Sequence, residues 1–196
     1  MAKKNITIIG IDYGAKLAGT TVLAVSENTK DVSIISCRKN EDADAFILQH
    51  LKKYPNAVIC IDAPISLPIV YKQPEKSTEY FYRKCDKLLQ AMSPMFLGGL
   101  TARAMQLKAK SNLPFYEVYP AALANVLSLK NLQYKREKTA IRPITEKVLQ
   151  HFNIRCTHTF TTWHEADALL ALCIGFRIQN KIATPYGDIE EGTIWV

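Results

Sequence analysis

Three aspartates far apart in this sequence each lie at one end of an apolar run. Asp12 ends Ile-Ile-Gly-Ile-Asp, Asp62 ends Val-Ile-Cys-Ile-Asp, and Asp167 lies in His-Glu-Ala-Asp, which opens a long apolar stretch. Carboxylates gathered at the rim of a core repel one another unless cations hold them, and such oxygen ligands favour Mg²⁺ or Mn²⁺. The three residues therefore indicate a divalent-metal site for phosphate chemistry. The alternative for each is a turn residue, because Asp commonly follows a strand.

Two of these aspartates are predicted to end buried strands, over 5–12 and 57–62, because short β-branched runs suit a sheet that is covered on both faces. Residues 19–26 and 31–38 predict two more strands. The short turns between them make the first three strands antiparallel neighbours. A further strand is predicted over 114–119.

Helical spacing of apolar residues predicts helices over 41–53, 75–92, 100–111, 120–128 and 138–152. The second and third of these form a helical insertion after the strand over 57–62. This order of elements predicts an α/β fold with a mixed five-stranded sheet, in which three antiparallel strands are followed by parallel strands, flanked by helices.

The last helix has a clear start. Thr162 and Glu165 match a capping box, in which each side chain binds the other residue's amide, and this explains Glu165 as a structural residue. The body over 166–178 is almost wholly apolar and should be buried against the sheet. The tail over 182–196 predicts a small hairpin or edge strand.

Length and composition favour one domain over residues 1–196, because this length buries a full core but is short for two domains. No stretch approaches the roughly 18 apolar residues that a membrane helix needs, so we expect no membrane partner. The five cysteines are scattered and odd in number, without a Cys-x-x-Cys pair. They are typical of reduced thiols, which predicts a cytoplasmic protein.

The net charge of +7 comes from 25 Lys and Arg against 18 Asp and Glu. A basic surface around an acidic pocket would suit a polyanionic substrate such as a nucleic acid. The basic residues gather over 72–87, 103–110 and 130–142. The alternative for these segments is an ordinary solvated helix face.

The order of elements and their acidic strand ends resemble the ribonuclease H-like superfamily, especially its RuvC-like resolvases. Gly-Ile-Asp-Tyr-Gly over 10–14 is similar to the first-strand motif, and Asp62 lies where the family places a carboxylate after the fourth strand. His-Glu-Ala-Asp-Ala-Leu over 164–169 is similar to the last-helix signature, in which some members carry His at the first paired position. Four more phrases resemble, nearly end to end, a family of predicted RNase H-like nucleases: Ile-Asp-Ala-Pro-Ile-Ser-Leu-Pro (61–68), Arg-Lys-Cys-Asp (83–86), Glu-Val-Tyr-Pro (117–120) and Glu-Gly-Thr-Ile-Trp-Val (191–196).

The resemblance implies a nuclease that hydrolyses phosphodiester bonds of DNA or RNA with one or two Mg²⁺ or Mn²⁺ ions. Asp12, Asp62 and Asp167 would be catalytic residues and metal ligands. His164 would bind an ion or move a proton. His164 and Asp167 are three residues apart, so they share one helix face near the N-terminus, where the helix dipole favours a carboxylate.

Four other residues are candidates for the site. Glu117 lies in an apolar strand, where an unpaired carboxylate is costly, so we expect either a fourth metal ligand or a partner for Arg83 or Arg103. Arg83 and Asp86 match the family's Arg-x-x-Asp, which implies substrate contacts; the alternative is an exposed salt bridge. Lys16, in the turn after the first strand, is expected to approach a substrate phosphate; the alternative is an ordinary solvated loop lysine.

Two other functions stay open at this point. One is a nucleic-acid-binding adaptor with little turnover. The other is nucleotide phosphoryl transfer, because Asp12-x-Gly14 followed by Thr20 also resembles the phosphate loop of actin-like ATPases and sugar kinases, which need a longer chain. Resolvase-like enzymes that cut two strands symmetrically are dimers, so the resemblance also implies a homodimer.

Overall fold

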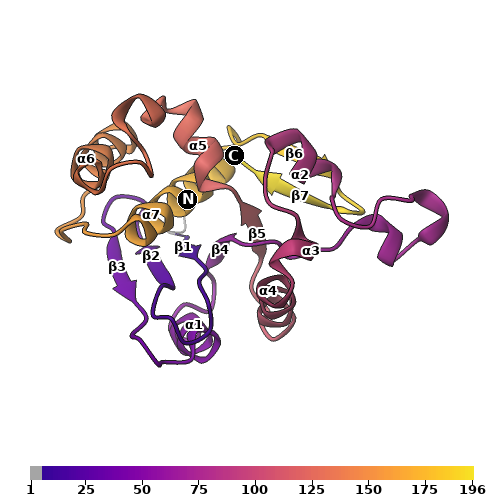
Figure 1. Ribbon diagram of the computed structural model, residues 1–196. Coiled ribbons are helices and arrows are strands. Elements are labelled where there is room, and N and C mark those ends of the chain that lie inside the picture. The colour runs from indigo at the N-terminus through magenta and orange to yellow at the C-terminus, as the bar shows by residue number, and fades with distance from the viewer. Residues whose placement is uncertain (1–5) are drawn as a thin grey trace, which may run out of the picture.

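A mixed sheet in the order β3-β2-β1-β4-β5-β7-β6 runs through the computed structural model, which describes residues 6–196 (Figure 1). The strands are β1 (Ile8–Asp12), β2 (Val22–Ser26), β3 (Ser33–Ser36), β4 (Val58–Asp62), β5 (Phe115–Val118), β6 (Pro185–Asp188) and β7 (Gly192–Trp195). The α-helices are α1 (Ala43–Leu51), α2 (Lys84–Leu89), α3 (Pro94–Leu97), α4 (Gly99–Ala109), α5 (Pro120–Val126), α6 (Ile141–Phe152) and α7 (Trp163–Gln179). Four 3₁₀ turns complete the set: η1 (Ile69–Tyr71), η2 (Pro74–Lys76), η3 (Leu129–Leu132) and η4 (Lys138–Ala140).

The strand directions are those predicted from the sequence. β2 pairs antiparallel with both β1 and β3, whereas β4 runs parallel to β1 and to β5. β1 and β2 are buried along their whole length, as expected for β-branched runs in the middle of a covered sheet. The predicted α/β class, with a mixed sheet flanked by helices, is therefore confirmed.

The strand count is a correction, because over residues 6–196 the sheet has seven strands and the sequence predicted five. The C-terminal segment forms the predicted hairpin of β6 and β7, and β6 is also an edge strand of the sheet, which was the other predicted form. β7 pairs parallel with β5, with Glu117 opposite Ile194 and Val118 opposite Trp195. This pairing joins residues far apart in the chain, so local sequence patterns do not reveal it.

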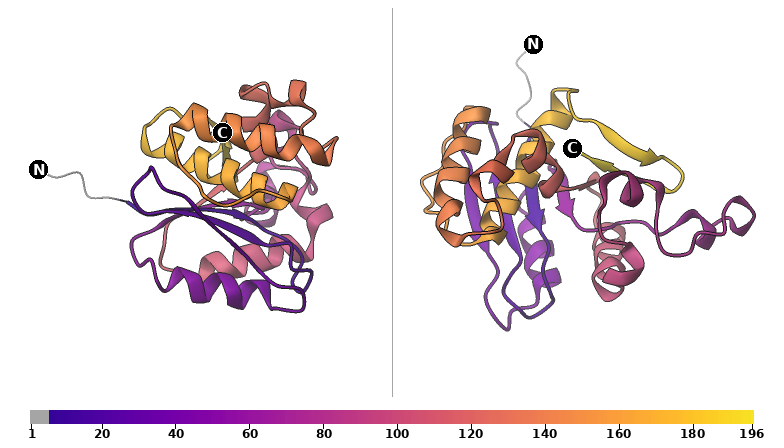
Figure 2. Two further views of the ribbon diagram at one scale, coloured as in Figure 1. Left: turned by 90° about the vertical axis from the view of Figure 1, so that its left-hand side faces the viewer. Right: turned by 45° about the horizontal axis from the view of Figure 1, so that its top comes forward.

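Helices cover both faces of the central strands (Figure 2). The core on one face includes Phe46 and Ile47 of α1 and Leu107 of α4. The core on the other face is larger and is built from α5, α6 and α7. The buried helix α7 packs directly against β1, β2 and β4.

Two glycines allow α7 to lie this close to the sheet. A Cβ atom on Gly10 of β1 would stand 2.4 Å from the carbonyl oxygen of Ala168 and 2.2 Å from the amide nitrogen of Leu172, both in α7. A Cβ on Gly175 of α7 would stand 2.4 Å from the Ile8 side chain. The contact at Gly10 fixes the first turns of α7 beside the end of β1.

Gly10→Ala is therefore expected to destabilise the protein by about 1–3 kcal/mol, because the added methyl group must push α7 off the sheet. Equilibrium unfolding in urea measures this change. Gly99→Ala is the matched control, since a Cβ at that position meets no atom within 4 Å. An unchanged stability of Gly10→Ala would show that α7 does not approach β1 this closely.

The predicted helix over 75–92 forms only in its second half, as the short α2 (Lys84–Leu89). This segment contains the end of η2, an extended stretch and then the short α2. The side chain of Glu79 accepts hydrogen bonds from the amides of Phe81 and Tyr82, which holds the backbone in a turn in place of a helix. The other predicted helices form within a few residues of their expected bounds, and α3 is an additional short helix.

Three other expectations concern the chain as a whole. All five cysteines are free thiols, as predicted. Within residues 6–196, every helix is too short or too polar to cross a membrane. The single domain over 1–196 stays a prediction, and Asn5, the first residue of the first predicted strand, lies outside the described residues.

Candidate metal centre

Asp12 and Asp62 are brought together by the register of two parallel strands. β1 and β4 pair so that Asp12, the last residue of β1, lies directly opposite Asp62, the last residue of β4. Both carboxylates therefore leave the sheet at the same edge. Asp12 is 9% exposed and Asp62 is partly buried, so the two charges lie at the rim of the core.

Asp167 reaches the same edge from the start of α7. The predicted capping box is present: the Thr162 hydroxyl accepts from the Glu165 amide at 3.2 Å, and the Glu165 carboxylate accepts from the Thr162 amide at 2.9 Å. This cap fixes where the helix begins, and the contact of Gly10 with Ala168 fixes where it lies. Asp167 is consequently held beside the ends of β1 and β4.

The three carboxylates offer oxygen atoms that lie within 4.8 Å of one another. Burial raises the pKa of Asp62 well above its ordinary value, and the neighbouring charges of Asp12 and Asp167 raise it further. Burial also raises the pKa of Asp167, with a further contribution from the Asp12 charge. Without a bound cation, Asp62 and Asp167 therefore resist ionising beside the Asp12 charge.

A small divalent cation fits this donor set. Three carboxylates supply the hard oxygen ligands that Mg²⁺ and Mn²⁺ prefer, without the cysteine or histidine cluster that softer metals favour. The repulsion that opposes their joint ionisation is what such a cation would relieve. Asp12, Asp62 and Asp167 are thus the residues that could hold the ion.

His164 lies at the edge of this cluster, one turn before Asp167 in α7. Its Nδ1 atom is 2.8 Å from Oδ2 of Asp12, and its side chain is 47% exposed. This hydrogen bond raises the pKa of the imidazole above its ordinary value. The structure therefore shows a direct contact between His164 and Asp12, which the sequence did not predict.

Two neighbouring residues in the cluster were missed from the sequence, Tyr134 and Lys135. The Tyr134 hydroxyl donates a hydrogen bond to Oδ1 of Asp167, and Nζ of Lys135 is 2.6 Å from Oδ2 of the same carboxylate. Both residues belong to the basic segment 130–142. That segment has the composition of a solvated surface, so nothing in its pattern separates Lys135 from the other lysines.

Glu117 is a partner of Arg83 and is not in the three-carboxylate group. The Arg83 guanidinium donates to both Glu117 carboxylate oxygens, at 2.6 and 2.7 Å. Glu117 also accepts from the Ile65 amide at 3.0 Å. Of the two roles expected for Glu117, the structure shows the ion pair with Arg83 and not a place among the metal ligands.

Arg83 and Asp86 are also placed differently from the expected substrate contacts. Their side chains are fully buried, and Nη2 of Arg83 is 2.6 Å from Oδ1 of Asp86. The exposed salt-bridge alternative is likewise wrong. This is a correction with a simple physical reason: the guanidinium is shared between Asp86 and Glu117, so the whole group is satisfied inside the protein and leaves no donor for a substrate.

Lys16 lies on the surface near the start of α1. Its Nζ atom is 3.1 Å from Oδ2 of Asp42, and its side chain is 54% exposed. An exposed pair of this kind is easily exchanged for another anion. The contact of Lys16 with a substrate phosphate stays a prediction.

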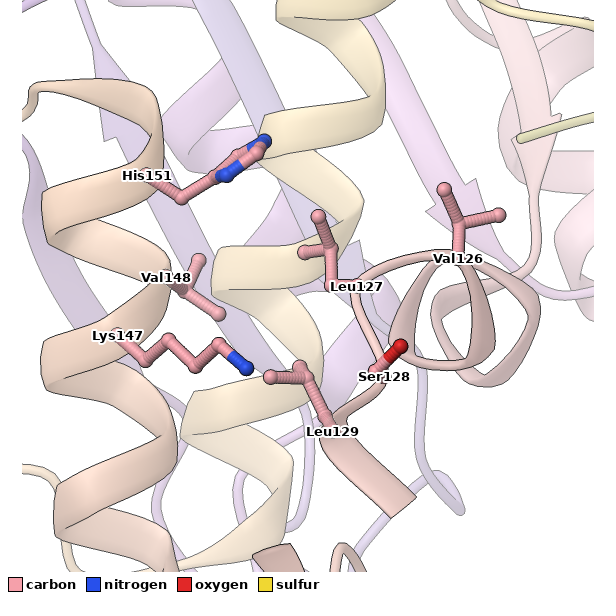
Figure 3. Close-up of a pocket in the computed structure, with 7 residues that line it drawn as sticks. All are labelled: Val126, Leu127, Ser128, Leu129, Lys147, Val148 and His151. Atoms are coloured by element: carbon pink, nitrogen blue, oxygen red, sulfur yellow. The ribbon is translucent and has the colours of Figure 1, made fainter. Parts of the chain in front are cut away.

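A separate cavity of about 270 Å³ lies between the end of α5, η3 and α6 (Figure 3). Val126, Leu127 and Leu129 form an apolar side, and Lys147 and His151 of α6 line the other. None of the three clustered aspartates lines it. The cavity is therefore distinct from the candidate metal centre.

Comparisons with known proteins identify no family. No family model matches the sequence, and no curated protein matches it. Among solved structures, the fold is similar to that of T. thermophilus RuvC in complex with a Holliday junction substrate, with a TM-score of 0.49 and 16% identity. The match covers 90% of this chain and 96% of that one. At this distance the likeness says nothing about the activity of the present protein.

Proposed function

We propose that this protein is a metal-dependent nuclease that hydrolyses phosphodiester bonds of nucleic acids. The observation that carries the proposal is the convergence of Asp12, Asp62 and Asp167, from β1, β4 and α7, within 4.8 Å. Ordinary turn residues would not be expected to converge at one buried edge, because burial and mutual repulsion oppose the ionisation of carboxylates there. The ordered motifs that resemble predicted RNase H-like nucleases support membership of that family.

The proposed ligands are Asp12, Asp62 and Asp167, with Mg²⁺ or Mn²⁺ as the ion. The chemistry that such an ion supplies in a carboxylate site is activation of a water molecule and stabilisation of the leaving oxygen. His164 directs Nδ1 to Asp12, which leaves Nε2 to hold or pass a proton during hydrolysis. Its side chain is half-exposed, so the imidazole can exchange protons with solvent.

Substrate binding would rely on the positive surface of the protein. The chain has a net charge of +7, and Lys135 connects the basic segment 130–142 directly to the carboxylate cluster. A nucleic-acid backbone lying on this segment would pass the cluster.

We also propose the cytoplasm as the compartment, because all five cysteines are free. A homodimer is kept as the proposed assembly for symmetric cleavage of two strands.

The decisive experiment is cleavage of a labelled substrate panel with Mg²⁺, with Mn²⁺ or with EDTA. The panel contains a four-way DNA junction, single-stranded DNA, duplex DNA, RNA and an RNA–DNA hybrid, and ATP consumption is followed in parallel. We expect phosphodiester cleavage of at least one substrate with metal and none with EDTA. Asp62→Asn should lose this activity while it keeps the parent's folded circular dichroism spectrum.

Each alternative function predicts a different result. An adaptor would bind nucleic acid without cutting it under any metal condition. A kinase-like protein would consume ATP and leave every strand intact. Either result, obtained with folded protein, would contradict the nuclease proposal.

A further inference from the structure

The segment between η3 and η4 supplies hydrogen-bond donors to both oxygens of one clustered carboxylate. Tyr134 donates to Oδ1 of Asp167, and Lys135 places its ammonium 2.6 Å from Oδ2. Asp167 is 3% exposed, whereas the Lys135 side chain is 46% exposed. A positive charge that is half in water is therefore bound to a carboxylate that is almost wholly inside the protein.

The backbone of this segment directs the two side chains at the cluster. Gln133 and Lys135 have φ values of 64° and 58°, in the left-handed region that residues with a Cβ seldom adopt. Tyr134 is buried between them and packs edge-on against Trp163 at the start of α7, with ring centroids 5.3 Å apart. The buried Tyr134 anchors the turn, and the turn presents Lys135 to Asp167.

The Lys135 ammonium also acts on the other two carboxylates. The three carboxylates offer oxygen atoms within 4.8 Å of one another, so an ammonium 2.6 Å from Asp167 lies near all three negative charges. The Lys135 charge opposes the rise in pKa of both Asp62 and Asp167. Lys135 therefore serves as a counter-ion for the whole cluster when no metal is bound.

We propose that Lys135 is an internal competitor for the divalent ion, which binds only as the ammonium leaves Asp167. This inference rests on the metal site of the proposed function. Lysine suits such a role, because its compact charge sits on a flexible stem that can turn into water. If the site binds metal only while Lys135 is displaced, its apparent affinity is the intrinsic affinity multiplied by the fraction of time for which Lys135 is displaced. Lys135 would thus set the metal concentration at which the centre fills.

The test compares Mg²⁺ dissociation constants, measured by titration calorimetry, for the parent and for Lys135→Met. We expect the variant to bind Mg²⁺ about fivefold or more tightly, the lower end of usual coupling between sites. It should also melt at a lower temperature than the parent in EDTA, because the carboxylates lose their counter-ion. Lys135→Arg keeps the charge and should bind Mg²⁺ as the parent does. Lys135→Gln replaces the Met variant if that protein aggregates, with the same expected direction.

Lys138→Met is the matched control, since it removes the same charge from an exposed position of the basic segment 130–142, at the start of η4. It should leave Mg²⁺ affinity unchanged, so equal tightening in both variants would reduce the effect to general surface charge and overturn the inference. Equal or weaker Mg²⁺ binding by Lys135→Met would also overturn it, because Lys135 would then not compete. If the parent itself bound no Mg²⁺ or Mn²⁺, the metal site of the proposed function would fail as well. The parent's own titration therefore separates the two failures.

Discussion

Asp12→Asn is expected to abolish the thermal stabilisation that Mg²⁺ or Mn²⁺ gives the parent protein. Asp12 contributes one of the three clustered carboxylates, and the amide that replaces it is a much weaker ligand for a hard cation. Ligand binding to the folded state stabilises it by about 2.7 kcal/mol when the ligand is at 100 times its dissociation constant. The parent should show a rise in melting temperature of this origin in millimolar metal, and Asp12→Asn should show almost none.

The same variant should hold or raise the melting temperature in EDTA. The charge of Asp12 raises the pKa values of Asp62 and Asp167, so removing it relieves repulsion in the metal-free protein. Asn keeps the shape of the side chain and one oxygen that can face His164. Scanning calorimetry with EDTA and with metal measures both effects on one preparation. Metal-dependent cleavage should fall by more than about a hundredfold, because substitution of residues that only support the metal ligands commonly lowers metal affinity or activity about 10–100-fold.

Asp188→Asn is the control for this variant, since Asp188 lies in β6 at the far edge of the sheet and is exposed. It should keep both the metal-induced stabilisation and the cleavage activity. A parent protein that gains no stability from Mg²⁺ or Mn²⁺ would show that the three acids are ordinary turn and cap residues. Strong destabilisation of Asp12→Asn in EDTA would have the same meaning.

The central part of the site could be predicted because it depends on local patterns. Apolar β-branched runs define where β1 and β4 lie, and Asp12 and Asp62 are the residues at which those runs stop. Adjacent parallel strands bring their ends to one edge of the sheet. The start of α7 follows from the capping box of Thr162 and Glu165, which is also a short-range signal.

The rest of the site depends on contacts between distant segments, which local patterns do not report. Lys135 reaches Asp167 through a left-handed turn that is formed without glycine and is anchored by burial of Tyr134.

The buried ion pair of Arg83 and Asp86, outside the carboxylate cluster, was also only partly predictable. The spacing of Arg83 and Asp86 revealed the pair but not its burial. In the buried pair, Arg83 is shared with Glu117 of β5, and Glu191 accepts hydrogen bonds from the amides at both ends of the 69–84 segment that carries Arg83.

Arg83→Met is expected to destabilise the protein by about 3–5 kcal/mol, the usual cost of removing one partner from a buried ion pair. The Arg83 side chain is 0% exposed and bonds to Asp86, Glu117 and the Ser66 hydroxyl. Its loss leaves two buried carboxylates without their shared cation. Equilibrium unfolding in urea measures the change, and Arg142→Met, which removes an arginine that is 80% exposed, should have little effect.

The cost of Arg83→Met should grow with pH. Burial already raises the pKa of Glu117 above its ordinary value although Arg83 opposes this, so the pKa must rise further once Arg83 is gone. A carboxyl group whose pKa is higher in the folded than in the unfolded state loses stability as pH rises between those two values. The deficit should therefore be larger at about pH 8 than at about pH 5. Adding Glu117→Gln to Arg83→Met should recover part of the stability at high pH, because it removes one of the two orphaned charges. A deficit that is independent of pH, or a double variant no more stable than Arg83→Met, would show that Arg83 acts through packing and not as the counter-ion of Glu117.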